Sequence, residues 1–319
     1  MTKILWVFLV VSLVSCSKKN SDVTIAPTPP PAMIGDSLGA GWSKINSPQN
    51  ETQLYDIFFT NSQSGFAVGQ KGIYKSVNAG NTWLQVVNNV TFLSISSYSA
   101  KSIFAGPINK IHNTQNAVLF NASQITGTLN DNGFYDCFFT SGSICYATSE
   151  NAVYKSVDGG LNFFTIKIFN DAANITALSF LNDNMGFMGR ANKLYKTIDG
   201  GTNWLLLNTA STSSVTAIEY LSTNIIYYAS IVGVFKSIDG GTTFNLVFNL
   251  SGNLFSDIDF IDATNGYLCF GKQIFKTVDA GANWNKVVGL AGSSLLEIHF
   301  TDLNHGWACG DSLIYRYSN

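Results

Sequence analysis

The sequence predicts an all-β protein, a seven-bladed β-propeller of four-stranded antiparallel blades. Three observations predict this fold. One phrase of eleven residues returns five times at a period near forty, which indicates a repeat architecture. Residues 41–319 give room for seven such units. The two ends of this region hold partial repeats that complement each other, as expected for a ring closed by pairing its ends.

The phrase combines a strand with a tight turn. It occurs at Ile73–Trp83, Val153–Phe163, Leu194–Trp204, Val234–Phe244 and Ile274–Trp284. An alternating apolar and polar run precedes D-G-G, D-A-G or N-A-G, where Asp or Asn can bond nearby backbone N–H groups and Gly tolerates positive φ. A structural role in the turn is therefore predicted for the residues at the acid position, Asn78, Asp158, Asp199, Asp239 and Asp279.

A second motif precedes the turn phrase in each unit. Four clear copies begin at Asp56, Ala177, Asp257 and Glu297, and each gives a strand, a polar turn and a strand that opens with Gly and an aromatic residue. Each unit therefore holds four strands, here called a to d in chain order. The short connections favour antiparallel pairing, because a parallel pair needs a long crossover.

The chain ends predict how the ring closes. The last unit ends at Asn319, which occupies the acid position 40 residues after Asp279, so the unit lacks its strand d. The segment Gly41–Ile45 contains Trp42 and resembles the beginning of a strand d. We expect this segment to form the outer strand of the last blade and remove the open edges. Residues 90–123 form the degenerate second blade.

These motifs resemble known propeller families. The S/T-x-D-x-G-x-x-W pattern resembles the Asp-box, or BNR, repeat of β-propellers. Over residues 41–319, the F-x-D-x-x-x-G-aromatic phrase followed by IYKTxDGGxxW resembles the YCF48-like, photosystem II stability/assembly-factor family of seven-bladed propellers. The resemblance implies a non-catalytic assembly factor that holds a membrane-protein partner. The family's partner surface is rich in arginine, whereas this chain has only Arg190 and Arg316, so photosystem binding is not carried over.

Residues 1–15 are predicted to be a bacterial lipoprotein signal peptide. Lys3 precedes the apolar run Ile4–Val14, which is too short to span a membrane, and Leu13–Cys16 resembles a lipobox. We expect cleavage before Cys16 and lipidation of its sulfur and new N-terminus, which anchors the chain stably. This predicts a lipid-anchored protein of the cell envelope, at the outer membrane. The alternative is an ordinary cleaved signal peptide with a chance cysteine.

Residues 16–40 are predicted to form the lipidated Cys and a flexible tether. The segment is polar and contains Pro27–Pro31. Gly35–Gly39 also resembles the nucleophile motif of GDSL esterases around Ser37, and Asp302 and His305 resemble their late block. A nucleophile elbow needs a preceding strand and a following helix, which this tether lacks. We therefore do not expect a hydrolase at Ser37.

Composition limits the classes of function. The formal charge is −2 and only 12% of residues are charged, which gives no electrostatic footprint for nucleic acid. Four cysteines follow Cys16, and they are expected to be buried free thiols because a propeller blade already has a core. They are Cys137, Cys145, Cys269 and Cys309. Their spacing does not match a C-x-x-C metal site, and no cofactor is expected.

Strand a carries the most suggestive set of polar residues. They share one parity, so they are expected to face the central channel: Asp56, Asp136, Glu219, Asp257, Asp259, Glu297 and His299. Such carboxylates could hold a cation; the alternative is a water-filled channel with solvated acids. Arg190, in a b–c loop, is a further candidate for binding.

The function predicted from these features is partner binding without catalysis. The arginine triad of sialidases cannot be built from two arginines, since lysine lacks the planar fork. We expect a monomeric scaffold that binds an envelope protein or a glycan through its d–a and b–c loops, which vary between repeats. The rival hypothesis is a glycoside hydrolase or lyase that uses channel carboxylates such as Asp259 and Glu297.

Overall fold

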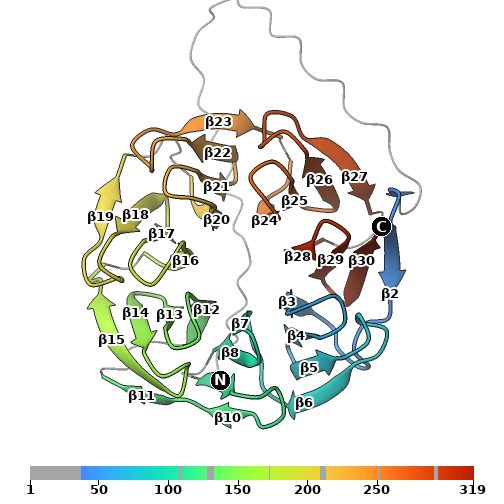
Figure 1. Ribbon diagram of the computed structural model, residues 1–319, viewed down its shortest axis with the longest axis horizontal. Helices are drawn as coiled ribbons and strands as arrows, with labels where there is room; N and C mark the ends of the chain where they lie inside the picture. The colour runs from blue at the N-terminus through green and yellow to red at the C-terminus, as the bar shows by residue number, and fades with distance from the viewer. Residues whose placement is uncertain are drawn as a thin grey trace, which may run out of the picture. The chain divides into compact units, whose positions relative to one another are not determined.

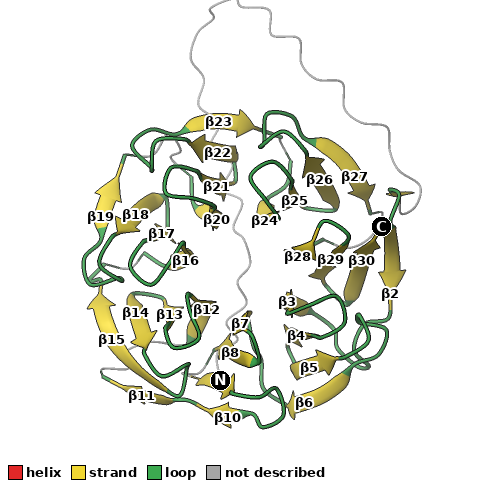
Figure 2. Ribbon diagram, in the orientation of Figure 1, coloured by secondary structure: helices red, strands yellow, loops and turns green. Residues whose placement is uncertain are grey.

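The computed structural model describes residues 37–107, 110–127, 133–171, 173–208, 213–250, 252–290 and 294–319. These residues form seven sheets arranged as blades round a central axis, which confirms the predicted seven-bladed propeller (Figure 1). The described ranges contain strands and loops but no helix (Figure 2). Within them, accordingly, no helix is long and apolar enough to cross a bilayer. The predicted signal peptide, Cys16 and residues 17–36 of the predicted tether lie outside the described residues.

Each blade has four antiparallel strands with strand a innermost, and blades three and six carry a fifth, short strand at the outer edge. Blade one has β3 (Leu54–Phe59), β4 (Gly65–Gly69), β5 (Gly72–Ser76) and β6 (Leu84–Asn88), and blade two has β7 (Ser94–Tyr98), β8 (Lys101–Gly106), β9 (Lys110–Thr114) and β10 (Asn121–Ala122). Blade three has β12 (Phe134–Phe139), β13 (Cys145–Ser149), β14 (Ala152–Ser156) and β15 (Asn162–Ile168), with β11 (Gln124–Thr126) parallel to β15 at its outer edge. The two-residue β10 agrees with the prediction that this repeat is degenerate.

The remaining blades follow the same order. Blade four has β16 (Ile175–Phe180), β17 (Gly186–Arg190), β18 (Lys193–Thr197) and β19 (Leu205–Leu207), and blade five has β20 (Val215–Tyr220), β21 (Ile226–Ser230), β22 (Gly233–Ser237) and β23 (Asn245–Phe248). Blade six has β24 (Phe255–Phe260), β25 (Gly266–Phe270), β26 (Gln273–Thr277) and β27 (Asn285–Gly289), and blade seven has β28 (Glu297–Asp302), β29 (His305–Gly310) and β30 (Leu313–Ser318).

The N-terminal strand completes blade seven as predicted. β2 (Trp42–Ile45) pairs antiparallel with β30, with Trp42 opposite Tyr317 and Ile45 opposite Ile314. The Trp42 ring is buried, and its centroid lies 5.5 Å from that of Tyr317 and 6.0 Å from that of Phe300. The last blade thus gains its outer strand from the start of the described chain.

The predicted tether ends earlier than expected. Ser37 and Leu38 form β1 and pair with Gly289 and Val288 of β27, and the Gly39 N–H donates to the Val287 carbonyl at 2.8 Å. The outer edge of blade six offers unpaired backbone groups, and β1 satisfies some of them. Residues 37–40 therefore belong to the propeller rather than to the tether.

Stacked aromatic rings explain the Gly-aromatic motif. An aromatic residue at or near the end of strand a stacks on a ring of the preceding blade: Phe300 of blade seven stacks on Tyr267 at 4.0 Å, and Phe59 of blade one stacks on Trp307 at 3.7 Å. The glycine that opens the next strand lies beneath this ring: a Cβ at Gly65 would come within 2.4 Å of Phe59. Such pairs add about 0.5–1.5 kcal/mol each beyond the area they bury.

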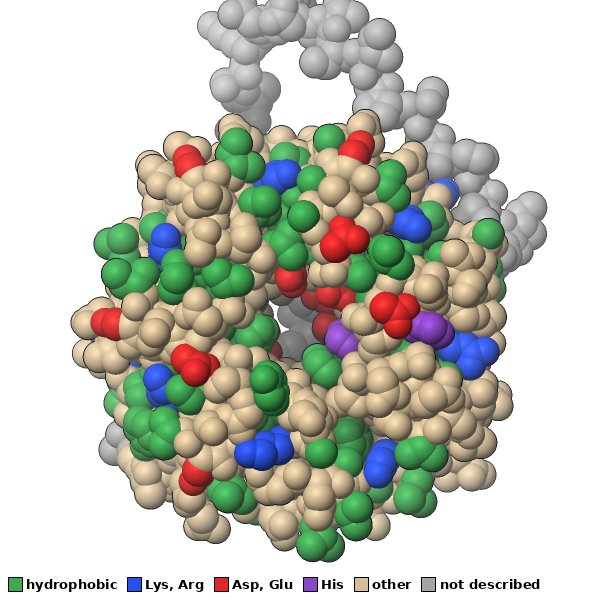
Figure 3. All heavy atoms as spheres, in the orientation of Figure 1, with side chains coloured by type: hydrophobic (Ala, Val, Ile, Leu, Met, Phe, Trp, Pro, Cys, Tyr) green, Lys and Arg blue, Asp and Glu red, His purple; other side chains and the backbone are tan. Residues whose placement is uncertain are grey.

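The propeller has two faces with different connections. The turn face carries the a–b turns, such as residues 60–64, and the c–d turns, such as residues 77–83. The loop face carries the b–c and d–a connections, such as residues 70–71 and 89–93. Figure 3 shows the turn face, with acidic side chains at the mouth of the central channel.

Candidate functional site: the central channel

The seven inner strands surround a cavity of about 380 Å³ at the centre of the ring. Because side chains alternate along a strand, every second residue of strand a points into this cavity. The structure brings together all seven predicted channel residues, which are Asp56, Asp136, Glu219, Asp257, Asp259, Glu297 and His299. Arg190 does not line it.

The channel carboxylates bind the backbone of the neighbouring blade. The Ile95 N–H donates to Asp56 Oδ2 at 2.6 Å, the Ile298 N–H to Asp257 Oδ2 at 3.1 Å, and the Phe300 N–H to Asp259 Oδ2 at 2.6 Å. An innermost strand has one unpaired edge, whose N–H groups need acceptors. Each of these three aspartates supplies one acceptor to the next blade along the ring.

Neutral side chains also form hydrogen bonds to the backbone of the next blade. Ser96 Oγ accepts from the Phe139 N–H at 2.8 Å, and Ser179 Oγ accepts from the Tyr220 N–H at 3.1 Å. His299 Nε2 lies 2.8 Å from the Phe59 carbonyl, to which it donates, and its ring stacks on Phe58. The serines occupy the same parity as the acids, but they carry no charge, so the charge pattern of strand a did not predict them.

Burial dominates the titration of the channel acids. It raises the pKa of Asp56 to about 8, of Asp259 to about 7 and of Asp136 to about 6, although hydrogen bonds from backbone N–H groups oppose the rise at each site. Burial also raises the pKa values of Glu219 and Glu297 well above their usual range. Asp56 is buried, whereas the other acids keep part of their surface accessible in the channel, which moderates this penalty for them.

The channel is therefore less anionic than its residue count suggests. Asp257 and Glu297 share a hydrogen bond between their side chains, which requires a proton on one of them. Burial lowers the pKa of His299 to about 4, so its imidazole is neutral at pH 7. Within the described residues no group of three or more His, Cys, Asp or Glu is arranged to hold a metal ion.

The acids of the repeated turns bind their own turn. Asp239 Oδ1 accepts from the Thr243 N–H at 2.9 Å and from the Ser237 hydroxyl at 2.8 Å, while the Gly241 N–H donates to Ser237 Oγ at 2.9 Å. These bonds to an exposed carboxylate lower the pKa of Asp239 to about 2. Asp158, Asp199 and Asp279 form equivalent bonds, and Asn78 uses its amide oxygen.

A lysine near the end of strand c bonds to the next blade. Lys196 Nζ donates to the Gly240 carbonyl at 2.7 Å, and Lys236 Nζ donates to the Ala280 carbonyl at 2.8 Å. Each accepting carbonyl belongs to the repeated turn of the next blade. The Lys236 ammonium also lies 5.2 Å from the centre of the Tyr227 ring. These lysines join blades near the turn face.

Arg190 lies apart from the channel, at the end of β17 on the loop face. Its side chain is fully buried and pairs with Asp171, which is exposed. Its guanidinium carbon lies 4.4 Å from the centre of the Phe169 ring. Arg190 thus fastens the connection between blades three and four.

The residues of the esterase-like motif lie in different blades. Ser37 is in β1 on blade six, whereas Asp302 and His305 belong to the a–b turn of blade seven, where His305 Nδ1 lies 2.9 Å from Asp302 Oδ1. Asp302 also accepts the Asn304 N–H, as Asp262 accepts that of Thr264 in blade six. The Asp-His pair is therefore part of a repeated turn geometry.

All four described cysteines are free and buried, as expected. Burial raises the pKa of the Cys145 thiol to about 12 and those of Cys137, Cys269 and Cys309 well above their usual range. These thiols are unreactive core groups.

Comparison with known proteins shows the fold and leaves the family open. No protein-family model matches the sequence, and no curated protein matches it. Among solved structures, YCF48 from Cyanidioschyzon merolae is 15% identical, with a TM-score of 0.72 over 88% of this chain and 99% of that one. A structure of YCF48 bound to D1 peptide is 15% identical, with a TM-score of 0.73 over 89% of this chain and 98% of that one.

An enzyme is equally similar in fold. Selenomethionine-substituted virginiamycin B lyase from Staphylococcus aureus is 12% identical, with a TM-score of 0.72 over 87% of this chain and 99% of that one. Binding and catalytic proteins thus share this architecture, so the fold alone does not assign an activity. What these likenesses establish is that the chain folds as a β-propeller similar to YCF48.

Proposed function

We propose that this chain is a non-enzymatic scaffold that binds a protein partner and is held at the bacterial cell envelope by a lipid on Cys16. One observation carries the proposal. Three of the channel carboxylates, those of Asp56, Asp257 and Asp259, are bonded to the backbone of the neighbouring blade, as the Asp259 carboxylate is to the Phe300 N–H. Groups fixed in this way hold the ring together.

A solved structure of YCF48 bound to D1 peptide supports this proposal, because YCF48 has a similar fold and holds a peptide there. The lipobox-like segment Leu13–Cys16 supports lipid anchoring. Its resemblance to the lipobox of envelope lipoproteins in Gram-negative bacteria favours the outer membrane. A closed ring with no unpaired blade favours a monomer. A glycan remains the second class of ligand to test.

Crosslinking in intact cells followed by mass spectrometry tests the proposal. We expect a protein partner to be recovered with the wild-type chain and to be lost or strongly reduced with Cys16→Ser, because an unanchored chain loses its high local concentration at the membrane. The same partner in equal amount with both chains would argue against anchoring. Failure to recover any partner would argue against a scaffold.

The rival function is a glycoside hydrolase or lyase. It is favoured by the pKa of Glu297, which burial raises well above its usual range, as in general acids. A screen of glycans with Asp259→Asn and Glu297→Gln separates the two functions. Turnover by the wild type that disappears in these variants would establish the enzyme, whereas no turnover on any glycan favours the scaffold.

A further inference from the structure

The hairpin tip of blade five exposes two adjacent aliphatic side chains on the loop face. Ile231 and Val232 connect β21 to β22, and each is 45% exposed. Turn positions ordinarily hold polar residues or glycine, which suit the turn geometry and the surrounding water. In five other blades each tip carries at least one polar or charged side chain: Gln70–Lys71, Glu150–Asn151, Ala191–Asn192, Gly271–Lys272 and Asp311–Ser312. Blade five alone among these six presents a wholly apolar tip.

The geometry of this tip does not require aliphatic residues. Ser230 is buried, and its Oγ accepts the Val232 N–H at 3.3 Å. In blade three a buried serine holds the same position, where Ser149 Oγ accepts the Ala152 N–H at 3.1 Å. The tip that this serine supports is Glu150–Asn151. A polar pair therefore fits the same scaffold, and the turn alone does not account for the aliphatic pair.

The sector of the loop face around this tip carries cations and no carboxylate of its own. Lys193 and Lys272 lie at or beside the b–c tips of blades four and six, on either side of blade five. Every acid of residues 190–294 belongs to the turn face or the channel: Asp199, Glu219, Asp239, Asp257, Asp259, Asp262 and Asp279. Asp171, in the connection that precedes blade four, is paired with Arg190. The surroundings of the apolar tip are therefore positively charged.

The N-terminal chain enters the propeller at the loop-face end of the adjacent blade six. Ser37 pairs with Gly289, the last residue of β27, and Gly289 also pairs with Gln273 beside the cationic tip of this blade. Twenty residues, 17–36, separate Ser37 from Cys16, which is expected to carry the lipid. A chain of this length spans at most about 70 Å when fully extended. A lipid on Cys16 therefore holds the loop-face edge of blades five and six within that distance of a bilayer.

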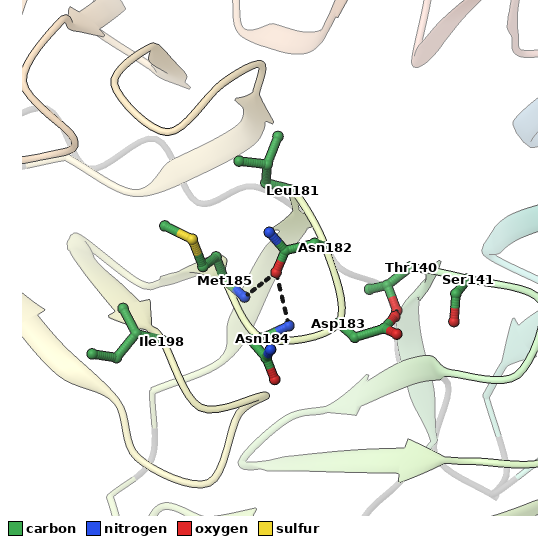
Figure 4. Close-up of a pocket in the computed structure, with 8 residues that line it drawn as sticks. All are labelled: Thr140, Ser141, Leu181, Asn182, Asp183, Asn184, Met185 and Ile198. Atoms are coloured by element: carbon green, nitrogen blue, oxygen red, sulfur yellow. Dashed lines mark hydrogen bonds between the residues drawn. The ribbon is translucent and has the colours of Figure 1, made fainter.

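The turn face lacks this combination. Its exposed aliphatic side chains lie singly, as Ile198 does, and acidic and basic side chains are mixed around the ring (Figure 3). A pocket of about 560 Å³ lies between the a–b turns of blades three and four, beside Ile198 and Met185 (Figure 4). The Asp183 carboxylate stands on its opposite side, where it would repel an anionic headgroup. No charge on the turn face therefore selects a lipid surface.

We infer that the tip of blade five inserts into the interface of an anionic bilayer and that Lys193 and Lys272 contact the phosphate groups of its lipids. Aliphatic side chains beside lysines suit this boundary, because the apolar groups leave water while the cations meet anionic headgroups. A weak contact suffices, since the lipid on Cys16 keeps the tip at a high local concentration near the membrane. The inference rests on the lipid anchor of the proposed function and adds its orientation, with the loop face toward the bilayer.

Depth-dependent fluorescence quenching in vesicles tests the inference. The lipidated full-length chain carries one added cysteine, Val232→Cys or, on the turn face, Ile198→Cys, and an environment-sensitive fluorophore is attached to it; the four described native thiols are buried. The vesicles contain phosphatidylethanolamine, phosphatidylglycerol and lipids with a spin label on the acyl chain. We expect quenching at position 232 and little at position 198.

Flotation of the same vesicles separates the anchor from the orientation. Chains that float with the vesicles but are quenched at neither position, or only at position 198, would overturn the inference and leave the anchor intact. Chains that do not float would overturn the anchor and the inference with it.

Matched substitutions test the chemistry of the contact. With the fluorophore at position 232, we expect Lys193→Gln to lower the ratio of inserted to free tip about fivefold. Ile231→Gln, which introduces the residue found at this position in blade one, should lower it by a similar factor. Added salt should also weaken insertion. Lys286→Gln removes the same charge from an exposed site on β27 and should leave quenching unchanged. Equal quenching of all these chains would overturn the inference.

Photo-crosslinking in the native cells separates a bilayer from a protein as the occupant. A photoreactive phenylalanine analogue replaces Ile231, and its adducts are identified by mass spectrometry. We expect lipid adducts to predominate. One protein as the main adduct would assign the tip to a protein partner and overturn insertion into the bilayer.

Discussion

Two sets of carboxylates in this protein accept backbone hydrogen bonds and titrate in opposite directions. In the channel, Asp259 accepts the Phe300 N–H of the next blade, and burial raises its pKa to about 7. In the turn of blade five, Asp239 accepts the Thr243 N–H of its own turn, and its pKa falls to about 2. The bond is of one kind, but the surroundings differ.

This difference shows that the local hydrogen bond alone does not set the cost of the charge. An exposed turn acid keeps its water and adds two or three donors, so its ionised form is favoured. A channel acid loses much of its water and faces other acids, so its ionised form is disfavoured despite the donor. The first set fixes turns within a blade, and the second joins blades around the axis.

The largest effect that sharpens this comparison is the pH dependence of stability. Folded Asp56, Asp136 and Asp259 hold protons between about pH 4 and 8 that the unfolded chain has released. Stability therefore falls as pH rises through this window, by an amount on the order of a few kcal/mol. The turn acids act in reverse, because their lowered pKa values give stability that is lost as pH falls below about 4.

Thermal unfolding measured from pH 3 to 9 checks this dependence. We expect the highest midpoint near pH 4 to 5, with a decline on both sides. Asp259→Asn should flatten the alkaline side and leave the acid side unchanged. A midpoint that rises steadily from pH 5 to 9 would contradict the raised pKa values of the channel.

The next effect is the loss of one bond between blades. Asp259→Ala removes the acceptor of the Phe300 N–H, and we expect a loss of about 1–2 kcal/mol in the free energy of unfolding at pH 5. At pH 8 the loss should be smaller, because the substitution also removes a disfavoured charge. Denaturant titration at both pH values measures it, and an equal loss at the two values would show that charge is irrelevant.

Removing the hydroxyl of a repeated turn should cost about 1 kcal/mol. Ser237→Ala leaves the Gly241 N–H without its acceptor at a buried site. Ser237→Thr is the matched control, because Thr197 and Thr277 occupy this position in blades four and six with the same bonds. Denaturant unfolding should separate Ala from Thr; a Thr variant as unstable as Ala would contradict the equivalence of the turns.

The smallest effect is expected from changing the charge of a turn and keeping its acceptor. Asp239→Asn should alter the free energy of unfolding at pH 7 by less than about 0.5 kcal/mol, since Asn78 already fills this position in blade one and accepts the Thr82 N–H at 2.9 Å. Calorimetry of this variant should show a reduced loss of stability below pH 4. A large loss at neutral pH would mean that the charge, not the acceptor, fixes the turn.

The fold could be predicted from the sequence because residues close together in each repeat determine its turns and strands. The turn phrase fixes a hairpin through Asp, Gly and a hydroxyl, and the spacing of forty residues fixes the size of a blade. Closure could also be predicted, since the last repeat lacks its strand d and the segment at Trp42 resembles a strand d without a blade of its own. Strand β1 could not, because a two-residue pairing to an edge has no periodicity to detect.

The candidate site was predictable in position and not in role. Parity alone places Asp56 and Glu219 in the channel. The N–H groups bonded to Asp56 and Asp259 lie about forty residues away on another blade, and the sequence does not show which backbone N–H each carboxylate meets. For the same reason the bonding of Lys196 to the next turn was missed, as was the pocket beside Ile198, which depends on how two blades are set against each other.

The short strand β1 has a mechanical consequence. It pairs with β27 of blade six through Ser37 and Leu38, whereas β2, the strand that closes the ring, begins only at Trp42 on blade seven. Tension applied to the chain ahead of Ser37 would reach the β1 bonds before it could load the closing strand. A force transmitted along the N-terminal chain is therefore resisted first by the bonds between β1 and β27. The pairing of β2 with β30, which closes the ring, is loaded only after those bonds break.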